Sequence, residues 1–354
     1  MTQFTHLSQP AVIGSRTVKN RIVVPPMAYF GGAGPDGLVT EKHLRHYGAF
    51  AKGGAGLVIV EACSVSRIPD RRNAIHVFDD TYIEGMKSLA KATRQNGAVA
   101  LVQLINPGLR QLPYDSIEEI PRSVFLKYQS DFADAAVRCQ RAGFDGVELH
   151  AAHGYYLDQI LETSQRTDGY GGSIENRCRI ITELVQEIHS RCGRDFIVSV
   201  RFGIPDFQEL KETARAIERA GGDLINISTG FDDYEKPADF PYSGRIYAAS
   251  LLKQEICLPI IGIGNIRDGQ TAETVLAAGY CDLIAVGRGH LCDPAWAGKV
   301  LAGEDPVPCL NCHPCICFRD GDRCQGRTKT PADTGKGVNR EERQNSVLNS
   351  VVFL

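Results

Sequence analysis

Short apolar runs alternate with longer amphipathic stretches along most of the chain. The runs are rich in Val, Ile and Leu without strict polar alternation, which is typical of parallel strands covered on both faces. The eight predicted strands are Ile22–Pro25, Gly56–Glu61, Ala98–Leu104, Gly146–His150, Ile197–Phe202, Leu224–Ser228, Pro259–Gly262 and Leu283–Val286. Eight such units favour an α/β protein with a (β/α)8 TIM barrel, and an open doubly wound sheet is the alternative.

The amphipathic stretches between these strands predict helices, for example Asp131–Ala142, Ile174–Cys192 and Gln208–Ala220. Ala-Gly pairs end several of them, at 142–143, 220–221 and 278–279, each just before a strand. A glycine in this place is typical of a left-handed helix C-cap. The pairs therefore mark where the helices stop.

Three regions follow from this pattern. We expect a barrel domain over residues 1–303, a cysteine-rich segment over 304–326 and a polar tail over 327–354. Before the first barrel strand, Ala11–Ile13 and Thr17–Lys19 flank Gly14-Ser15, which predicts an N-terminal hairpin that caps the lower end of the barrel. The polar segment from Gly326 to Asn345 is expected to be flexible or to lie on a partner subunit of a homo-oligomer.

Composition narrows the classes of partner. Hydrophobic residues make up 43% and charged residues 23%, close to an average globular protein. A net charge of −3 gives no basic field, so we expect a small-molecule partner and no nucleic acid. Neither a leader-like start nor a long apolar stretch is present, and we expect a cytoplasmic protein with no membrane partner.

The densest polar group at a predicted strand end follows the fourth strand. His150 and His153 are three residues apart and can donate two hydrogen bonds to one oxygen, while the phenol of Tyr155 can deliver a proton. The alternative is that one histidine packs in the core and the other faces solvent.

Glycine signals follow the last two strands, Gly264-Asn265 after the seventh and Gly287-Arg288 after the eighth. Barrels bind phosphate at the loops after these two strands, where backbone amides and an arginine can face an anion. Plain tight turns are the alternative. We predict an anion site, because the two motifs stand on consecutive strand ends.

Several motifs together resemble the Old Yellow Enzyme family of NADH:flavin oxidoreductases, in family order and across about residues 5–303. The segments are Asn20 to Met27, Gly53 to Val58, Gln103, His150 to Tyr155, and Arg166 to Ser173 with Glu175-Asn176-Arg177. The resemblance implies an FMN-binding TIM barrel that takes electrons from NAD(P)H.

Position by position, the resemblance implies a set of flavin contacts. Pro25, Pro26, Met27 and Ala62 would lie along the flavin ring, Gln103 would bond its pyrimidine edge, and Arg201 would stabilise the reduced flavin. Gly264, Asn265, Gly287 and Arg288 would hold the phosphate. For Arg201 the alternative is a surface salt bridge.

The implied reaction is an ene-reduction. His150 and His153 would bind the carbonyl oxygen of an enone, enoate or enoyl thioester, and Tyr155 would protonate the α-carbon. The alternatives are a flavin dehydrogenase of amines or steroids and an electron-transfer subunit. The sequence departs from the family at Ala28, which implies non-covalent FMN, and at Asn106-Pro107-Gly108, which leaves substrate contacts near Arg110 open.

Seven of the twelve cysteines are scattered and five lie between Cys309 and Cys324, which favours one metal or redox cluster over a disulfide framework. This segment resembles the 2,4-dienoyl-CoA reductase branch, and the resemblance implies a [4Fe–4S] cluster with Cys317 spare. The implied ligands are Cys309, Cys312, Cys315 and Cys324. Zinc or unliganded thiols are the alternatives. No Gly-x-Gly-x-x-Gly follows, so either an external donor would reduce the cluster or NAD(P)H would reduce FMN directly and leave the cluster idle.

Overall fold

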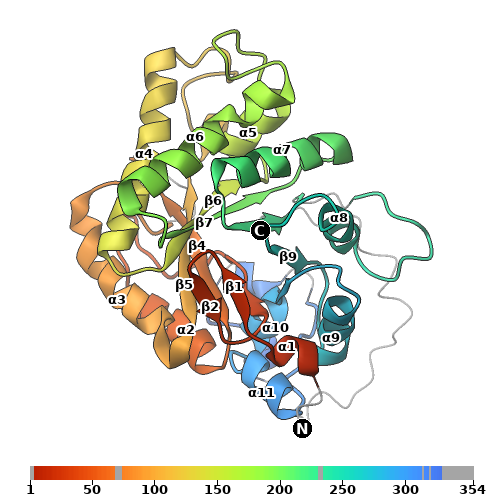
Figure 1. Ribbon diagram of the computed structural model, residues 1–354. Helices are drawn as coiled ribbons and strands as arrows, with labels where there is room; N and C mark the ends of the chain where they lie inside the picture. The colour runs from red at the N-terminus through yellow and green to blue at the C-terminus, as the bar shows by residue number, and fades with distance from the viewer. Residues whose placement is uncertain (1–3, 68–73, 230–233, 313–314, 319, 329–354) are drawn as a thin grey trace.

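A closed barrel of eight parallel strands forms the centre of the molecule (Figure 1). The computed structural model describes residues 4–67, 74–229, 234–312, 315–318 and 320–328. The strands are β3 (Ile22–Val24), β4 (Leu57–Ser64), β5 (Val99–Ile105), β6 (Gly146–Ala151), β7 (Ile197–Phe202), β8 (Leu224–Ile227), β9 (Ile260–Ile263) and β10 (Leu283–Ala285). Each pairs with the next, and β10 pairs with β3. The predicted TIM barrel is confirmed, and the open sheet is wrong.

Helices surround the barrel. They are α2 (Glu41–Lys52), α3 (Ile83–Thr93), α4 (Arg122–Arg141), α5 (Tyr156–Thr163), α6 (Ile174–Cys192), α7 (Phe207–Ala220), α8 (Gly244–Leu252), α9 (Gly269–Ala277), α10 (Gly287–Cys292) and α11 (Trp296–Ala302), with a short α1 (Thr5–Ser8) before them. The Ala-Gly pairs end helices as predicted, because Gly143, Gly221 and Gly279 have φ values of +92°, +91° and +70°. The predicted helix at 131–142 is only the second half of α4, which begins nine residues earlier, directly after Pro121.

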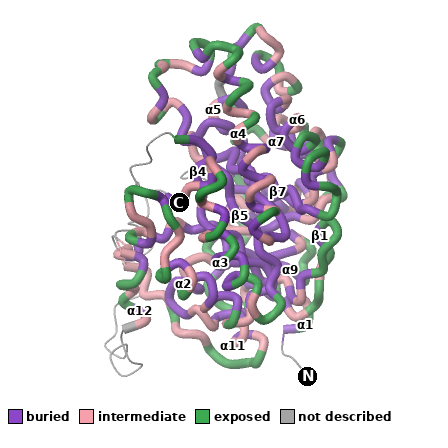
Figure 2. Tube along the Cα trace, turned by 90° about the vertical axis from the view of Figure 1, so that its left-hand side faces the viewer, coloured by how far each residue is buried: buried purple, intermediate pink, exposed green. Residues whose placement is uncertain are grey.

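Two apolar layers hold the barrel together. One lies between the strands and the helices, and the other fills the barrel interior at the amino ends of the strands. The predicted hairpin is confirmed as β1 (Ala11–Ile13) and β2 (Arg16–Val18), an antiparallel pair. Its buried Ile13 and Val18 belong to the interior layer, so the hairpin closes that end of the barrel. Figure 2 shows the buried chain concentrated around the strands.

The cysteine-rich segment folds back onto the barrel. Its described part contains a 3-10 turn η4 (Ile316–Phe318) and a short helix α12 (Gln325–Thr328) and, in those residues, no strand. The hydroxyl of Tyr29 donates to Asp322, and the Gly321 amide donates to the Phe30 carbonyl at 3.0 Å. These bonds tie the segment to the loop after β3. The predicted tail, 327–354, lies outside the described residues from position 329 onward.

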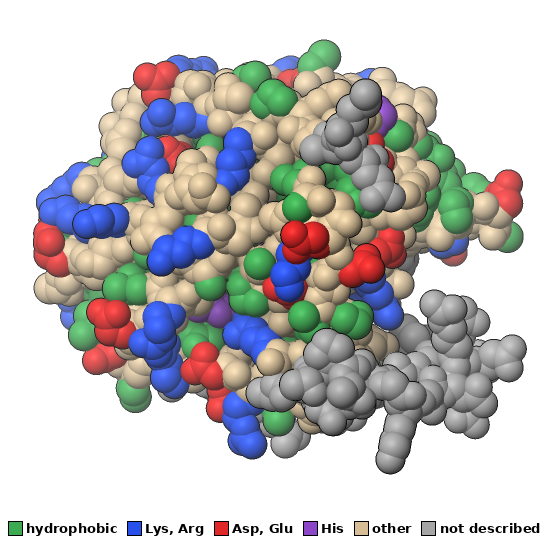
Figure 3. Space-filling model, turned by 90° about the horizontal axis from the view of Figure 1, so that it is seen from below, with side chains coloured by type: hydrophobic (Ala, Val, Ile, Leu, Met, Phe, Trp, Pro, Cys, Tyr) green, Lys and Arg blue, Asp and Glu red, His purple; other side chains and the backbone are tan. Residues whose placement is uncertain are grey.

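Charges of both signs lie on the face of the molecule seen from below. Figure 3 shows Lys and Arg side chains interspersed with Asp and Glu over the face seen from below. Within the ranges that the structure describes, no helix combines the length and the apolar character needed to cross a bilayer.

Candidate active site

A layer of buried polar side chains crosses the barrel above its apolar filling. The carboxylate of Glu148 on β6 accepts hydrogen bonds from Gln103 Nε2 (2.8 Å), Ser199 Oγ (3.3 Å) and Asn226 Nδ2 (3.0 Å). Gln103 and Ser199 lie in register with Glu148 on the two neighbouring strands. Burial raises the pKa of Glu148. Ser199 and Asn226 were not among the predicted site residues, although each is a polar residue inside an otherwise apolar strand.

One step further toward the carboxyl ends of the strands, Arg201 on β7 lies in register with His150 on β6. Arg201 is only 3% exposed, so the surface salt bridge considered for it is wrong. Its Nη2 donates to Ser228 Oγ at 3.2 Å, and the same hydroxyl lies 2.8 Å from His153 Nε2. Burial lowers the pKa of Arg201 to about 10, which still leaves the guanidinium charged at neutral pH. Ser228 therefore links Arg201 to His153.

The predicted His-His-Tyr group is brought together between β6 and α5. The ring centroids of His150 and His153 are 4.9 Å apart, and those of His150 and Tyr155 are 5.2 Å apart. His153 and Gly154 take φ values of +66° and +70°, which turn the chain sharply between strand and helix. His150 is buried, whereas His153 is half-buried and lines the cavities described below, so the shared role of the two rings stays a prediction.

A cavity of about 160 Å³ opens at the carboxyl ends of the strands. Its lining includes most of the predicted flavin contacts, namely Pro25, Pro26, Met27, Arg201, Gly264, Asn265, Gly287 and Arg288, together with His153 and Cys309. The other two predicted contacts lie on neighbouring strands, Ala62 on β4 and Gln103 on β5. Gly264 has a φ of +136°, a conformation that residues with a side chain rarely adopt.

Two arginines meet at one end of this cavity. Arg267, which the sequence analysis missed, and Arg288 both line it. Asn265 Oδ1 accepts from Arg267 Nε (2.9 Å) and Arg288 Nη2 (3.4 Å), and Asn311 Oδ1 accepts from Arg288 Nη1 (2.5 Å) and Arg267 Nη2 (3.5 Å). Both acceptors are neutral amides. Among the described residues, these hydrogen bonds pair neither guanidinium with a carboxylate.

This arrangement fits the FMN that the family resemblance implies. Two adjacent guanidiniums that share neutral acceptors favour an anion between them, such as a phosphate. At the other end, Arg201 Nε is buried and finds no hydrogen-bond acceptor among the described residues. A Cβ on Gly287 would lie 3.3 Å from Met27 Sδ, so a side chain at this position would crowd the cavity wall. The positive charges match an anionic ligand such as FMN.

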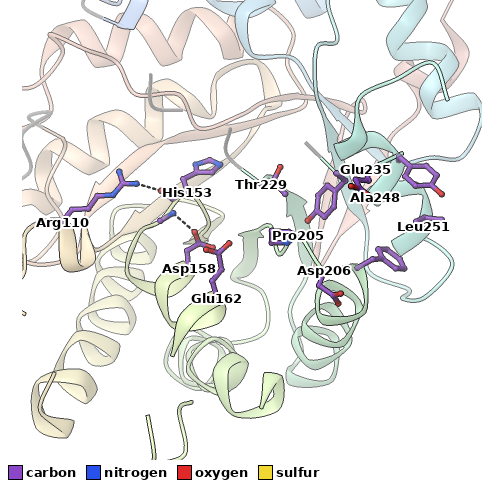
Figure 4. Close-up of a pocket in the computed structure, with 14 residues that line it drawn as sticks. Arg110, His153, Asp158, Glu162, Pro205, Asp206, Thr229, Glu235, Ala248 and Leu251 are labelled. Carbon is purple, nitrogen blue, oxygen red and sulfur yellow. Dashed lines mark hydrogen bonds between the residues drawn. The ribbon is translucent and has the colours of Figure 1, made fainter. Parts of the chain in front are cut away.

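A second cavity, of about 710 Å³, shares His153 with the first. Figure 4 shows Asp158 and Glu162 of α5 on one side of it and Ala248 and Leu251 of α8 on the other. Asp158 Oδ2 accepts the Gly154 amide at 2.5 Å. Burial, and then the charge of Glu162, raise the pKa of Asp158 to about 8. The cavity of about 710 Å³ next to His153 is large enough for a small-molecule substrate.

The cysteine cluster differs from its prediction. Cys292, at the end of α10, was taken for a scattered core thiol, yet it lies within hydrogen-bonding reach of Cys324. Cys317, predicted to be spare, contacts both Cys315 and Cys324. Within the described ranges, no three His, Cys, Asp or Glu side chains are arranged to hold a metal ion. The described residues therefore show no preformed metal site, and the four predicted ligands stay a prediction.

Comparison with known proteins places this site in a family. Residues 6–124 and 117–305 match the NADH:flavin oxidoreductase / NADH oxidase family. The chain is 34% identical to the NADH oxidase of Thermoanaerobacter brockii, over 100% of this chain and 60% of that protein. It is 30% identical to the cinnamate reductase of Clostridium sporogenes, over 95% of this chain and 58% of that one. The chain thus spans little more than half the length of these relatives.

Other relatives match over nearly their whole length. The NADPH dehydrogenase of Bacillus subtilis is 32% identical over 85% of this chain and 97% of its own. Among solved structures, the old yellow enzyme homologue from Zymomonas mobilis superposes with a TM-score of 0.74 at 22% identity, covering 86% of this chain and 95% of that one. That structure supports the fold. The chain therefore belongs to the NADH:flavin oxidoreductase / NADH oxidase family, as its resemblance to the Old Yellow Enzymes predicted.

Proposed function

We propose that the chain is an ene-reductase that binds FMN and uses NAD(P)H to reduce the activated C=C bond of an α,β-unsaturated carbonyl compound. The observation that carries the proposal is the single cavity in which an arginine pair, the buried Arg201 and His153 meet along a wall that includes Pro25 and Met27. The reductases and dehydrogenases among its relatives support the same class of chemistry.

In this proposal the residues hold FMN from end to end. Arg288, Arg267, Asn265 and the glycines Gly264 and Gly287 bind its phosphate, because they surround the positively charged end of the cavity. Pro25, Pro26 and Met27 of the cavity wall, with Ala62 of β4, would lie along the ring, and Gln103 of β5 would bond its pyrimidine edge. Arg201 would donate a hydrogen bond to the flavin from the barrel interior, where its fixed charge is weakly screened by water.

FMN bound here would supply two-electron redox chemistry, with NAD(P)H as the hydride donor and the β-carbon of the alkene as the acceptor. His150 and His153 donate hydrogen bonds to the carbonyl oxygen and so stabilise the enolate charge that develops there. Ser228 fixes the His153 ring through the 2.8 Å contact. Tyr155, buried beside His150, delivers the proton to the α-carbon.

One experiment separates this function from the two alternatives. The purified protein is loaded with FMN, reduced with NADH or NADPH without oxygen, and then mixed with cyclohexenone while the flavin absorbance is followed. An ene-reductase bleaches with the nucleotide and recovers with the enone. A dehydrogenase of amines or steroids would bleach on adding that substrate and would not recover with the enone. An electron-transfer subunit would exchange electrons with a ferredoxin but turn over neither compound.

Three further expectations stay part of the proposal. The chain is a cytoplasmic protein, it assembles as a homo-oligomer, and its cysteine segment holds a [4Fe–4S] cluster. The reaction above uses no such cluster. Its residues need only FMN, NAD(P)H and the unsaturated carbonyl compound.

A further inference from the structure

The cysteine-rich segment reaches the anion end of the flavin cavity through Asn311 and Cys309. Asn311 lies in the turn between Cys309 and Cys312, with a φ of +51° in the left-handed region. Its Oδ1 accepts from Arg288 Nη1 at 2.5 Å and faces Arg267 Nη2 at 3.5 Å. Cys309 of the same turn lines the cavity itself. The turn is therefore an outer wall of the site.

The arginine pair needs such a partner. Burial, and then the neighbouring charge of Arg288, lower the pKa of Arg267, so the two guanidiniums oppose each other in partly desolvated surroundings. Asn265 faces both arginines from the end of β9, and Asn311 faces both from the cysteine segment. A neutral acceptor on each side orients the donors without cancelling their charge, which leaves that charge for an anion.

Hydrogen bonds on both sides of the turn also fix the segment to the barrel. The segment is bonded to the loop after β3, because Tyr29 donates to Asp322 and the Gly321 amide donates to the Phe30 carbonyl. Nearer the turn, Val307 donates its amide to Asp293 Oδ2 at 2.9 Å. Asn311 is thus anchored to the barrel on both sides of the turn.

We propose that Asn311 is a positioning residue for the phosphate of FMN, through which the cysteine-rich segment sets how tightly the barrel retains its flavin. This inference rests on the proposed function, since it takes FMN as the ligand. It goes beyond the family's site because the residue belongs to the segment that was expected to serve only a metal cluster.

Riboflavin, which lacks the phosphate, makes the test specific. The full-length protein is freed of flavin, and the dissociation constants of FMN and riboflavin are measured by quenching of flavin fluorescence. Asn311→Ala removes the acceptor that orients Arg288, so the affinity for FMN should fall about 10-fold, the usual effect of one lost hydrogen bond to a charged group. The affinity for riboflavin should stay within about 2-fold of the wild type. Asn311→Asp should weaken FMN more strongly, about 100-fold, because a carboxylate would occupy Arg288.

Two further variants guard against a folding effect. Asn311→Gly suits the positive φ and should weaken FMN like Asn311→Ala. Asn96→Ala, at another asparagine of positive φ (+56°) that lies outside the cavity lining, should change neither constant. The inference is overturned if Asn311→Ala and Asn311→Gly bind FMN like the wild type, or lose both flavins equally. Failure of the wild type to bind either flavin would instead overturn the proposed function.

Discussion

The guanidinium of Arg110 lies over the ring of Tyr155, with its Cζ 4.5 Å from the ring centroid. Its Nη2 also donates to the His153 carbonyl at 2.7 Å (Figure 4). One side chain from the turn after β5 therefore contacts both ends of the strand-to-helix connection that carries the proposed catalytic group. The contacts of Arg110 were left open by the sequence. In the structure Arg110 acts as a brace, by which we mean that it packs on the Tyr155 ring and bonds the His153 carbonyl.

Replacing this brace should slow the step that uses Tyr155. Arg110→Met keeps the length of the side chain but removes the cation–π contact and the hydrogen bond. We expect the rate of reoxidation by cyclohexenone to fall about 10-fold with little change in KM, and reduction by NAD(P)H to stay the same. Stopped-flow absorbance measures both half-reactions. Arg110→Lys, which retains the charge, should be the milder variant, and equal rates in all three proteins would contradict the brace.

Removing the proposed proton donor should affect only the second half-reaction. Tyr155→Phe should lower the rate of enone reduction by about 10²- to 10⁴-fold, the usual range for a lost general acid, while NAD(P)H still reduces the flavin. The matched control is Tyr156→Phe, which removes the adjacent hydroxyl from a fully buried ring packed near Phe125 and Tyr128. If both variants lose activity alike, the effect is structural and Tyr155 is not the donor.

Asp158 should make stability depend on pH. Its folded-state pKa of about 8 lies above the ordinary value of 3.8, so the folded protein binds a proton that the unfolded chain releases between these values. Stability from this group is therefore complete below about pH 4 and is lost as pH rises toward 8, by up to about 1.4 kcal/mol per pH unit. Asp158→Asn should flatten the curve of unfolding free energy between pH 5 and 8. Parallel curves for the two proteins would show that Asp158 is ionised in the fold.

The cysteine segment can be tested by its metal content. If the [4Fe–4S] prediction holds, protein purified without oxygen contains about four iron and four sulfide per chain. Cys312→Ser should lose this iron, and Cys257→Ser, at an exposed cysteine outside the segment, should keep it. One zinc per chain would favour the zinc site, and no metal at all would favour unliganded thiols in the contacts of the described structure.

Much of the fold could be predicted because each strand and helix of the barrel is recognisable from its own stretch of sequence. A strand such as Ile197–Phe202 is buried along its whole length and stands out as an apolar run. Side-chain contacts between distant parts of the chain cannot be recognised in this way. Arg267 and Asn311 are 44 residues apart, and nothing in the intervening sequence indicates that the Asn311 amide contacts the Arg267 guanidinium. The same holds for Cys292, whose closeness to Cys324 depends on how the last segment folds back.

The central claim is that His150 and His153 face the flavin ring and bind the oxygen of the substrate. Phenols test this directly, because a phenolate resembles the enolate and its binding over oxidised flavin produces a long-wavelength absorption band. Titration of the FMN-loaded protein with a simple phenol should give this band, and the double variant His150→Ala, His153→Ala should weaken phenol binding at least about 100-fold, since two hydrogen bonds to a charged oxygen are lost. Unchanged phenol affinity in the double variant, with FMN still bound, would contradict the account.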